Sequence, residues 1–185
     1  MKVLSRLLVV TAFWAIVVSA SDNDKVFKSV HGNITKLDPS SKSMVVKTRG
    51  GAELNLTFVE STTVHGMDKG AAGSMQQFKG LSEGSEVVVH YWEGDGQKNA
   101  YEVDKVGLDK EALKYVDGKV TKVGNEGSTV VVKTISGAEM TFDVVGTDTA
   151  ASAKSLGKAA AKASTVTVYY TETSGKKIAH FFEKL

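Results

Sequence analysis

The 185-residue sequence contains no cysteine and only one proline. Without cysteine the chain forms no disulfide, offers no thiolate to a metal ion or a substrate, and lacks the attachment point of a lipid-anchored lipoprotein. The near absence of proline is accompanied by 18 glycines and by many valines and threonines. This composition favours short strands joined by glycine turns over helices.

Long hydrophobic runs are also scarce, and the one that stands out is Leu7–Val18, which follows Lys2 and Arg6. It is shorter than the ~20 apolar residues that span a bilayer, which argues against an uncleaved membrane anchor. Small residues at 18–20 supply a cleavage site, so the whole layout is that of a secretory signal peptide. We therefore expect residues 1–20 to be removed, leaving a periplasmic or extracellular protein without a stable membrane anchor.

The sequence also lacks a large excess of positive or negative charge. The formal net charge is +2, from 23 basic and 21 acidic residues. The expected signal peptide holds two of the basic residues and none of the acidic ones, so the remainder carries 21 of each and no net charge. A nucleic acid or an anionic membrane would find no overall electrostatic attraction, and we expect neither as a partner.

What the sequence does contain is an internal duplication. The stretch VVKTRGGAE at Val45–Glu53 returns as VVKTISGAE at Val131–Glu139, an offset of 86 residues. The alignment is free of gaps over 30–64, and it resumes over 85–106 at an offset of 79. A repeat of this length indicates a duplicated small domain. The expected organisation is a signal peptide at 1–20, a flexible leader at 21–29, a first domain at 30–107, a linker at 108–114 and a second domain at 115–185.

Each copy shows the apolar alternation of five half-buried strands. In the first copy the expected strands are Val30–Leu37, Met44–Thr48, Ala52–Val59, Glu86–Trp92 and Asn99–Val106. Their apolar rows include Leu54, Leu56, Phe58, Val87, Val89 and Tyr91. Between the third and fourth strands, the Ala- and Lys-rich segment 150–163 of the second copy favours a short helix, whereas glycine-rich 67–86 permits only a short helix or a loop.

Three strands, a helix or loop, and two further strands is the order of the five-stranded Greek-key barrel of the oligonucleotide/oligosaccharide-binding (OB) fold. An SH3-like barrel is the alternative. We predict a mainly β protein made of two tandem five-stranded OB-like small barrels.

The segments GNITKLD, STTVHG and LSEGSEVVVHYWEGDGQKNAYEVDKVG resemble a group of uncharacterised secreted bacterial proteins with tandem OB-like barrel domains. The shared motifs are a glycine in the first strand, a valine-rich second strand, a glycine turn and a Gly-Ser/Asp-x-Val-x-Val fourth strand. The second copy departs from this pattern at Lys162–Ser164, where the glycine is missing. The resemblance implies the fold and secretion, and it brings no catalytic residues with it.

The four histidines, His31, His65, His90 and His180, are the obvious metal-ligand candidates. His31 and His90 are expected on the outer face of neighbouring strands, where Glu102 would complete a metal site. No two histidines have the spacing of a metal motif such as His-Glu-x-x-His, and the second copy has Asp117 and Tyr169 at the positions of His31 and His90. We therefore expect exposed strand residues, no metal ion and no other cofactor.

A second set of candidates belongs to a partner surface. The outer face of the fourth strand carries His90 and Trp92, and its counterpart carries Tyr169; such an aromatic row either stacks on a sugar or a base, or forms the contact between the barrels. Met75 and Phe78 lie in the long glycine-rich connection and either plug the barrel end or serve a partner. An envelope protein or a glycan would suit this surface.

The remaining patterns argue against binding of single-stranded nucleic acid and against enzymatic activity. Lys36, Lys47 and Arg49 lack the aromatic platforms that accompany them in single-strand binders, so they indicate a solvated face. No Gly-x-Ser-x-Gly motif and no identifiable base is present. We expect a non-enzymatic binding or interaction module, with oligonucleotide or oligosaccharide binding on a barrel face as the alternative and a secreted hydrolase as the less favoured one.

Overall fold

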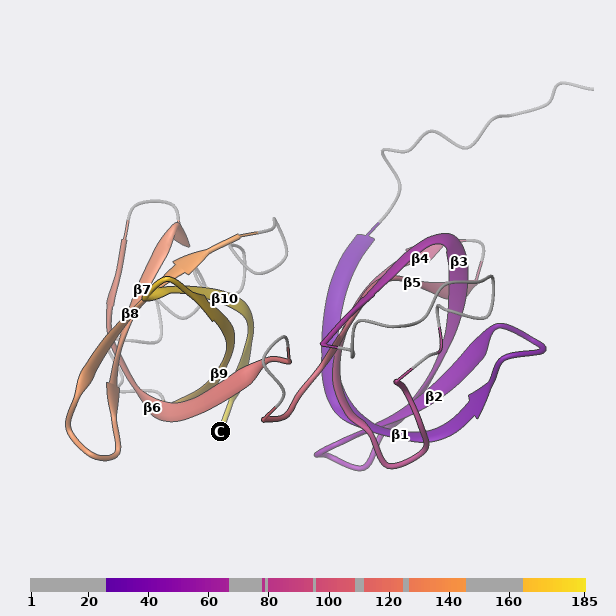
Figure 1. Cartoon of the computed structure of the whole chain (residues 1–185), viewed down its shortest axis with the longest axis horizontal. Coiled ribbons are helices and arrows are strands. Elements are labelled where there is room, and N and C mark those ends of the chain that lie inside the picture. The colour runs from indigo at the N-terminus through magenta and orange to yellow at the C-terminus, as the bar shows by residue number, and fades with distance from the viewer. Residues whose placement is uncertain are drawn as a thin grey trace, which may run out of the picture.

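The computed structural model describes residues 26–66, 78, 80–94, 96–108, 112–124, 127–145 and 165–185. These residues form ten strands and contain no α-helix (Figure 1). The first five strands are β1 (Val26–Asp38), β2 (Ser43–Thr48), β3 (Glu53–His65), β4 (Glu86–Gly94) and β5 (Gln97–Lys105). The second five are β6 (Lys114–Val123), β7 (Thr129–Thr134), β8 (Glu139–Val144), β9 (Thr165–Thr173) and β10 (Lys176–Lys184).

Both sets of strands close into barrels of the same topology. The first follows the order β1-β2-β3-β5-β4, with β4 pairing back to β1. The second follows β10-β8-β7-β6-β9, closed by β9 and β10. In each barrel the third and fifth strands run parallel and all other neighbours are antiparallel. This is the Greek-key order of the OB fold, since an SH3-like meander would pair the third strand with the fourth. The predicted pair of five-stranded OB-like barrels is confirmed.

The predicted apolar rows face the barrel interiors. In the first barrel the core contains Leu56, Phe58, Val87, Val89 and Tyr91, with Leu54 packed against it. The core of the second barrel is built from the corresponding positions, which include Val130, Phe142, Val166, Val168 and Tyr170. Alternation along each strand therefore places one face inside, as expected for half-buried strands.

Each barrel has a glycine in its first strand for a steric reason. A Cβ atom on Gly32 would collide with the backbone carbonyl oxygen of Lys47, and one on Gly118 would collide with that of Lys133. At these points the first strand approaches the second too closely for any side chain. The duplicated glycine is therefore a requirement of barrel closure.

Two strands extend beyond the ranges that the sequence predicts. β1 begins at Val26 rather than Val30, because residues 26–29 pair with β4, where Ser29 lies opposite His90. These residues fall in the segment expected to be a leader. β3 runs on to His65 rather than ending at Val59, because it continues alongside β5 after an irregularity.

The irregularity in β3 lies between Phe58 and Thr63. There the hydroxyl of Thr62 accepts a hydrogen bond from the amide of Val59 and donates one to the carbonyl of Ala100. This bridge fixes the bend to β5, so that Thr63 pairs with Glu102 and His65 with Asp104. The extension of β3 is what brings His65 to the fifth strand.

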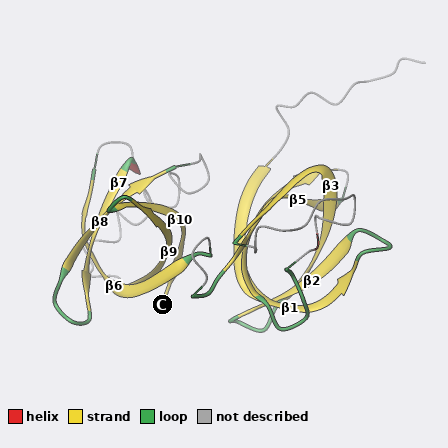
Figure 2. Cartoon of the chain, in the orientation of Figure 1, coloured by secondary structure: helices red, strands yellow, loops and turns green. Residues whose placement is uncertain are grey.

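The helix expected at 150–163 lies outside the described residues, as do residues 1–25 and 67–77. The connections that are described are turns and loops, apart from single 3₁₀ residues at Phe78 and Gly127 (Figure 2). Within the described ranges, no helix has the length and apolar character needed to cross a membrane.

The two barrels lie side by side (Figure 1) and are joined by an apolar cluster that we call the barrel junction. It consists of Val88, Val106, Leu113 and Tyr169, which are buried, together with Phe181, which packs against them. Val106 and Leu113 also form a parallel bridge between the two barrels' flanking segments. On the outer face of β4 the junction covers Val88, and His90 lies against Ser29, Tyr101 and Asp104. Five consecutive residues of that strand, 87–91, are therefore buried instead of every second one.

Candidate metal centre

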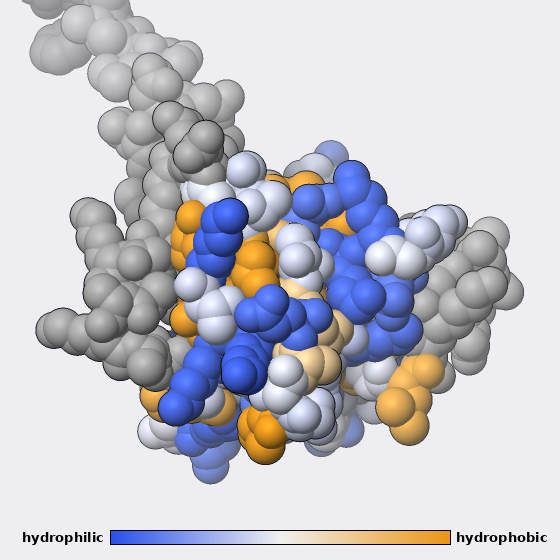
Figure 3. Space-filling model, turned by 90° about the vertical axis from the view of Figure 1, so that its left-hand side faces the viewer, coloured by the Kyte–Doolittle hydropathy of each residue, from blue (hydrophilic) through white to orange (hydrophobic). Residues whose placement is uncertain are grey.

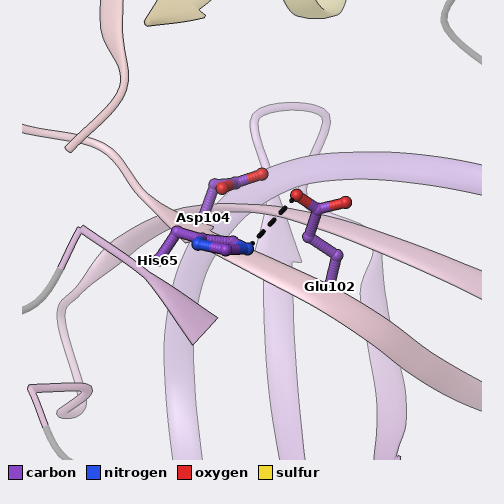
Figure 4. Close-up of side chains that lie close together, drawn as sticks. All are labelled: His65, Glu102 and Asp104. Carbon is purple, nitrogen blue, oxygen red and sulfur yellow. Dashed lines mark ion pairs between the residues drawn. The ribbon is translucent and has the colours of Figure 1, made fainter. Parts of the chain in front are cut away.

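Three potential metal ligands converge where β3 and β5 run parallel: His65, Glu102 and Asp104 (Figure 4). Glu102 and Asp104 are two residues apart on β5 and so project from the same face of the sheet. His65 stands opposite Asp104 in register, which places its imidazole beside both carboxylates. One ligand atom from each residue lies within 4.8 Å of the other two, and Nε2 of His65 is 3.6 Å from Oε1 of Glu102.

Exposure falls steeply across this group. The side chain of His65 is 54% exposed and that of Glu102 is 29% exposed, whereas that of Asp104 is only 3% exposed. The cluster therefore opens to solvent at the imidazole of His65 and is closed at the carboxylate of Asp104. A small ion has a way in, and the deepest ligand is shielded from water.

The environment of the Asp104 carboxylate is unusual for a residue with a purely structural role. Its Oδ2 atom is buried and has no hydrogen-bond partner among the described residues. Burial, followed by the charge of Glu102, raises the pKa of Asp104 above its ordinary 3.8, and the imidazoles of His90 and His65 oppose that shift. A buried carboxylate oxygen without a hydrogen bond is costly, and such an atom marks a place where a cation would be favourable.

A second imidazole borders the cluster from β4. His90 is opposite Glu102 in register, and its Nε2 atom lies 3.7 Å from Oδ2 of Asp104. The Oγ atom of Ser29 lies 3.0 Å from the other ring nitrogen, Nδ1. A hydrogen bond at one ring nitrogen holds the orientation of the other, as the outer partners of metal-bound histidines do.

The geometry suits an ion better than direct hydrogen bonds. The separations of 3.6 Å and 3.7 Å between imidazole and carboxylate are longer than those of well-formed hydrogen bonds. Tetrahedral coordination with bonds of about 2.0–2.2 Å places ligand atoms about 3.3–3.6 Å from one another, close to these values. Imidazole and carboxylate together form a donor set for borderline divalent transition ions.

The site is not duplicated. At the offset of 79 residues that relates the fourth and fifth strands, His90 corresponds to Tyr169 and Glu102 to Phe181. These two residues of the second barrel belong instead to the barrel junction. The two barrels share one strand order, and the matching positions belong to a potential ligand site in the first barrel and to an apolar contact in the second.

Sequence reasoning weighed His31, His90 and Glu102 as a metal site, and the structure separates them. His90 and Glu102 do face each other across β4 and β5. His31 points to the second barrel, where its ring packs against Tyr169 with the ring centroids 4.5 Å apart, and its Nε2 atom is 2.9 Å from Glu86. It is 7% exposed and not the solvated strand residue expected, because the junction covers it.

Sequence reasoning counted His65 among the four histidines but did not place it in the weighed site, and it did not consider Asp104. His65 lay beyond the expected end of the third strand, and nothing in the sequence reports its register against Asp104. The sequence did contain one indication of the cluster, the spacing of Glu102 and Asp104. Two carboxylates at positions i and i+2 of a strand lie on the same face of the sheet.

The residues considered for a partner surface occupy different environments. His90, Tyr169 and Phe78 are buried, so their side chains serve the interior of this chain. Phe78 packs in the core of the first barrel against Phe58, with ring centroids 4.4 Å apart. Trp92 is half-buried on β4 and lies over Gly94, and Met75 lies outside the described residues.

The face of the second barrel that points away from the first is mainly hydrophilic (Figure 3). Its hydrophobic residues are separated from one another by polar ones in that view. Scattered apolar side chains are normal on a protein surface. Among the described residues in that view, apolar and polar side chains are therefore interspersed across this face.

No protein-family model matches the chain, and no curated protein matches it. Among solved structures, apo-CusF from Escherichia coli is similar at 11% sequence identity with a TM-score of 0.35, covering 48% of this chain and 98% of its own. The silver complex of CusF from the same organism gives 10% identity and a TM-score of 0.35, covering 45% and 95%. At these values the similarity carries no argument about the ligand or the activity of this protein.

Proposed function

We propose that this protein is a non-enzymatic binding module that acts outside the cytoplasm and holds a divalent transition-metal ion at His65, Glu102 and Asp104. The observation that carries the proposal is the buried Oδ2 atom of Asp104, which has no hydrogen-bond partner in the described part of the chain and lies among an imidazole and a carboxylate with metal-ligand spacing. A binding role fits a rigid barrel surface, where strands rather than loops hold the ligands.

The donor atoms favour Zn²⁺, Ni²⁺, Co²⁺ or Cu²⁺ over other ions. Mg²⁺ and Ca²⁺ select sites made of oxygen atoms, and His65 contributes nitrogen. Copper(I) selects thiolate and thioether sulfur, and none of the three clustered side chains carries sulfur. Zn²⁺ is the most suitable probe because it accepts histidine and carboxylate together and undergoes no redox chemistry.

Action outside the cytoplasm rests on the amino-terminal pattern of Lys2 and Arg6, an apolar run and small residues at 18–20. Mass spectrometry of the protein recovered from cells tests this part of the proposal. The expected mature chain begins at Ser21, and an intact residue 1–20 segment in the cell membrane would contradict it.

One observation supports a competing function, that of a hydrolase. Ser29, His90 and Asp104 follow one another in space in the order of a catalytic triad. However, the His90–Asp104 separation of 3.7 Å exceeds a hydrogen bond, and His90 is 4% exposed, which keeps it from a substrate. Ser29 also lies within the β1–β4 ladder rather than on an exposed turn. We therefore favour binding over hydrolysis.

The direct test is isothermal titration calorimetry of the purified protein with ZnCl₂, with MgCl₂ as the ion that should not bind. We expect one Zn²⁺ per chain, and a loss of affinity of at least about tenfold for His65→Gln and for Glu102→Gln. Glu53→Gln is the matched control, because Glu53 is an exposed carboxylate on the same strand as His65 and lies outside the cluster. Absence of Zn²⁺ binding, or equal affinity in all four proteins, would refute the proposed site.

A further inference from the structure

One histidine of the first barrel lies within the contact between the two barrels. His31 on β1 is 7% exposed, and it stands opposite Val88, a buried residue of the barrel junction. The ring of Tyr169, on β9 of the second barrel, packs against the imidazole with the ring centroids 4.5 Å apart. Burying an imidazolium is costly unless its N–H groups find acceptors, so the neighbours of the ring decide its charge state.

Carboxylates from both barrels approach the two ring nitrogens of His31. Nε2 lies 2.9 Å from Oε1 of Glu86, which belongs to β4 of the same barrel. Nδ1 lies 3.3 Å from Oε2 of Glu183, which belongs to β10 of the second barrel. The side chain of Glu86 is 40% exposed and that of Glu183 is 18% exposed. Solvent therefore screens the contact across the junction less than the contact within the first barrel.

The hydroxyl of Tyr169 is the third polar group beside the ring, and it is also an acceptor toward it. It lies 3.1 Å from each ring nitrogen of His31 and donates its own hydrogen to Glu183. A neutral imidazole has one N–H donor and one bare nitrogen, so it would turn a lone pair toward an acceptor. Only the imidazolium, with two N–H donors, matches all the neighbours of the ring.

The charge around the ring also favours the imidazolium. Arg49, in the turn after β2, lies 3.8 Å from Oε2 of Glu183, and its side chain is 59% exposed, so solvent weakens this contact. Among the described residues, the charged and titratable groups around His31 are thus Glu86 from β4, Tyr169 from β9, Glu183 from β10 and Arg49 beyond Glu183. Two carboxylates and one guanidinium leave a negative charge that a protonated ring balances.

We infer that His31 is a pH-sensitive latch between the barrels, in which the imidazolium binds Glu183 across the junction and mild acid strengthens docking. Separating the barrels takes Glu183 and Tyr169 away from the ring and leaves it only Glu86. The docked form therefore binds the imidazole proton more tightly than the separated form. It follows that docking is strongest in mild acid and weakens as the pH rises through the range in which imidazoles titrate, at about 6.5.

The test is hydrogen exchange at the amide of Leu113, a junction residue that donates this amide to the carbonyl of Lys105. Its protection factor, corrected for the intrinsic effect of pH, reports opening of the junction. Between pH 5.5 and 7.5 we expect the factor to fall at least about threefold in the parent protein. The fall should disappear in His31→Gln and in Glu183→Gln. Glu139→Gln, which changes an exposed carboxylate of the second barrel, is the matched control and should behave as the parent does.

A second measurement, nitrogen-15 NMR of the His31 ring at pH 5.5, reads the charge state directly. We expect both ring nitrogens to carry protons in the docked parent protein. A bare ring nitrogen under these conditions would overturn the inference, even if His31→Gln loosens the junction for steric reasons. A protection factor that does not depend on pH in the parent would overturn it as well. So would a pH dependence that persists in His31→Gln, since another group would then be responsible.

Discussion

The phenolic hydroxyl of Tyr169 lies 3.1 Å from both ring nitrogens of His31, a residue 138 positions earlier in the chain. The same hydroxyl donates a hydrogen bond of 3.3 Å to Glu183, which in turn lies 3.8 Å from the guanidinium of Arg49. Burial, with the charge of Glu183, raises the pKa of Tyr169, so this hydroxyl stays protonated. These contacts form the polar edge of the junction and complement its apolar cluster.

We predict that Tyr169→Phe lowers the free energy of unfolding by about 1–2 kcal/mol, because the change leaves buried polar groups without their partner. Denaturant unfolding followed by tryptophan fluorescence measures this. Tyr115→Phe is the matched control, since Tyr115 is 60% exposed, and it should have almost no effect. Equal effects of the two changes would show that the hydroxyl of Tyr169 contributes nothing to docking.

Asp104→Asn separates a ligand site from a structural ion pair. If Asp104 and His90 formed a structural pair, breaking it would cost about 3–5 kcal/mol. Oδ2 of Asp104 has no hydrogen-bond partner in the described residues. We therefore expect Asp104→Asn to change the free energy of unfolding of the chelator-treated protein by less than about 1 kcal/mol. The same variant should lose the increase in melting temperature that Zn²⁺ gives the parent protein.

The control for that experiment is Asp117→Asn. Asp117 accepts a 2.6 Å hydrogen bond from Thr167 and is expected to contribute to stability through it. A large loss of stability in Asp104→Asn without metal, equal to or above that of Asp117→Asn, would argue that Asp104 has a structural role.

Phe78→Ala should destabilise the protein by ~3 kcal/mol or more, because Phe78 is 8% exposed and packs on Phe58 in the first core. A thermal melt measures the effect. Leu108→Ala, at a fully exposed position, should leave the melt unchanged. An unchanged melt for Phe78→Ala would return this residue to the candidates for a partner surface.

Gly32→Ala and Gly118→Ala test the steric requirement of barrel closure. Each added Cβ would meet a carbonyl oxygen of the second strand, so we expect a loss of about 1–3 kcal/mol for each change. Gly50→Ala is the control, since the nearest atom to its Cβ would be the Thr48 hydroxyl oxygen at 3.8 Å. Similar stabilities for all three variants would show that the strands separate readily at these crossings.

Acid dependence is predicted for Asp38, which accepts hydrogen bonds from Ser40 and Ser41 in the turn after β1. These bonds lower the pKa of Asp38 from 3.8 to about 2. A lowered pKa means that the carboxylate stabilises the fold above pH 3.8, and that this contribution disappears as the pH falls through 2. Asp38→Asn should therefore be less stable than the parent protein at neutral pH and equally stable near pH 1.5, as chemical denaturation at the two pH values would show. A difference that persists in acid would contradict the assignment.

The sequence alone was sufficient for the duplicated five-strand pattern, the interior apolar rows and the β fold. Each of these is local: alternation along Val87, Val89 and Tyr91 reports one buried face wherever the strand lies. The offset of 86 residues likewise requires no knowledge of contacts. The repeated glycine was visible too, although its steric cause was not.

Only the tertiary structure decided what lies on the outer faces. The burial of Val88 comes from the barrel junction, and the position of His65 comes from a bend in β3 that aligns it with Asp104. Register between parallel strands that are distant in sequence is set by hydrogen bonds and packing across the sheet. No period within either strand encodes it. The apolar rows could thus be predicted from the sequence, whereas the histidine–carboxylate cluster required the folded chain.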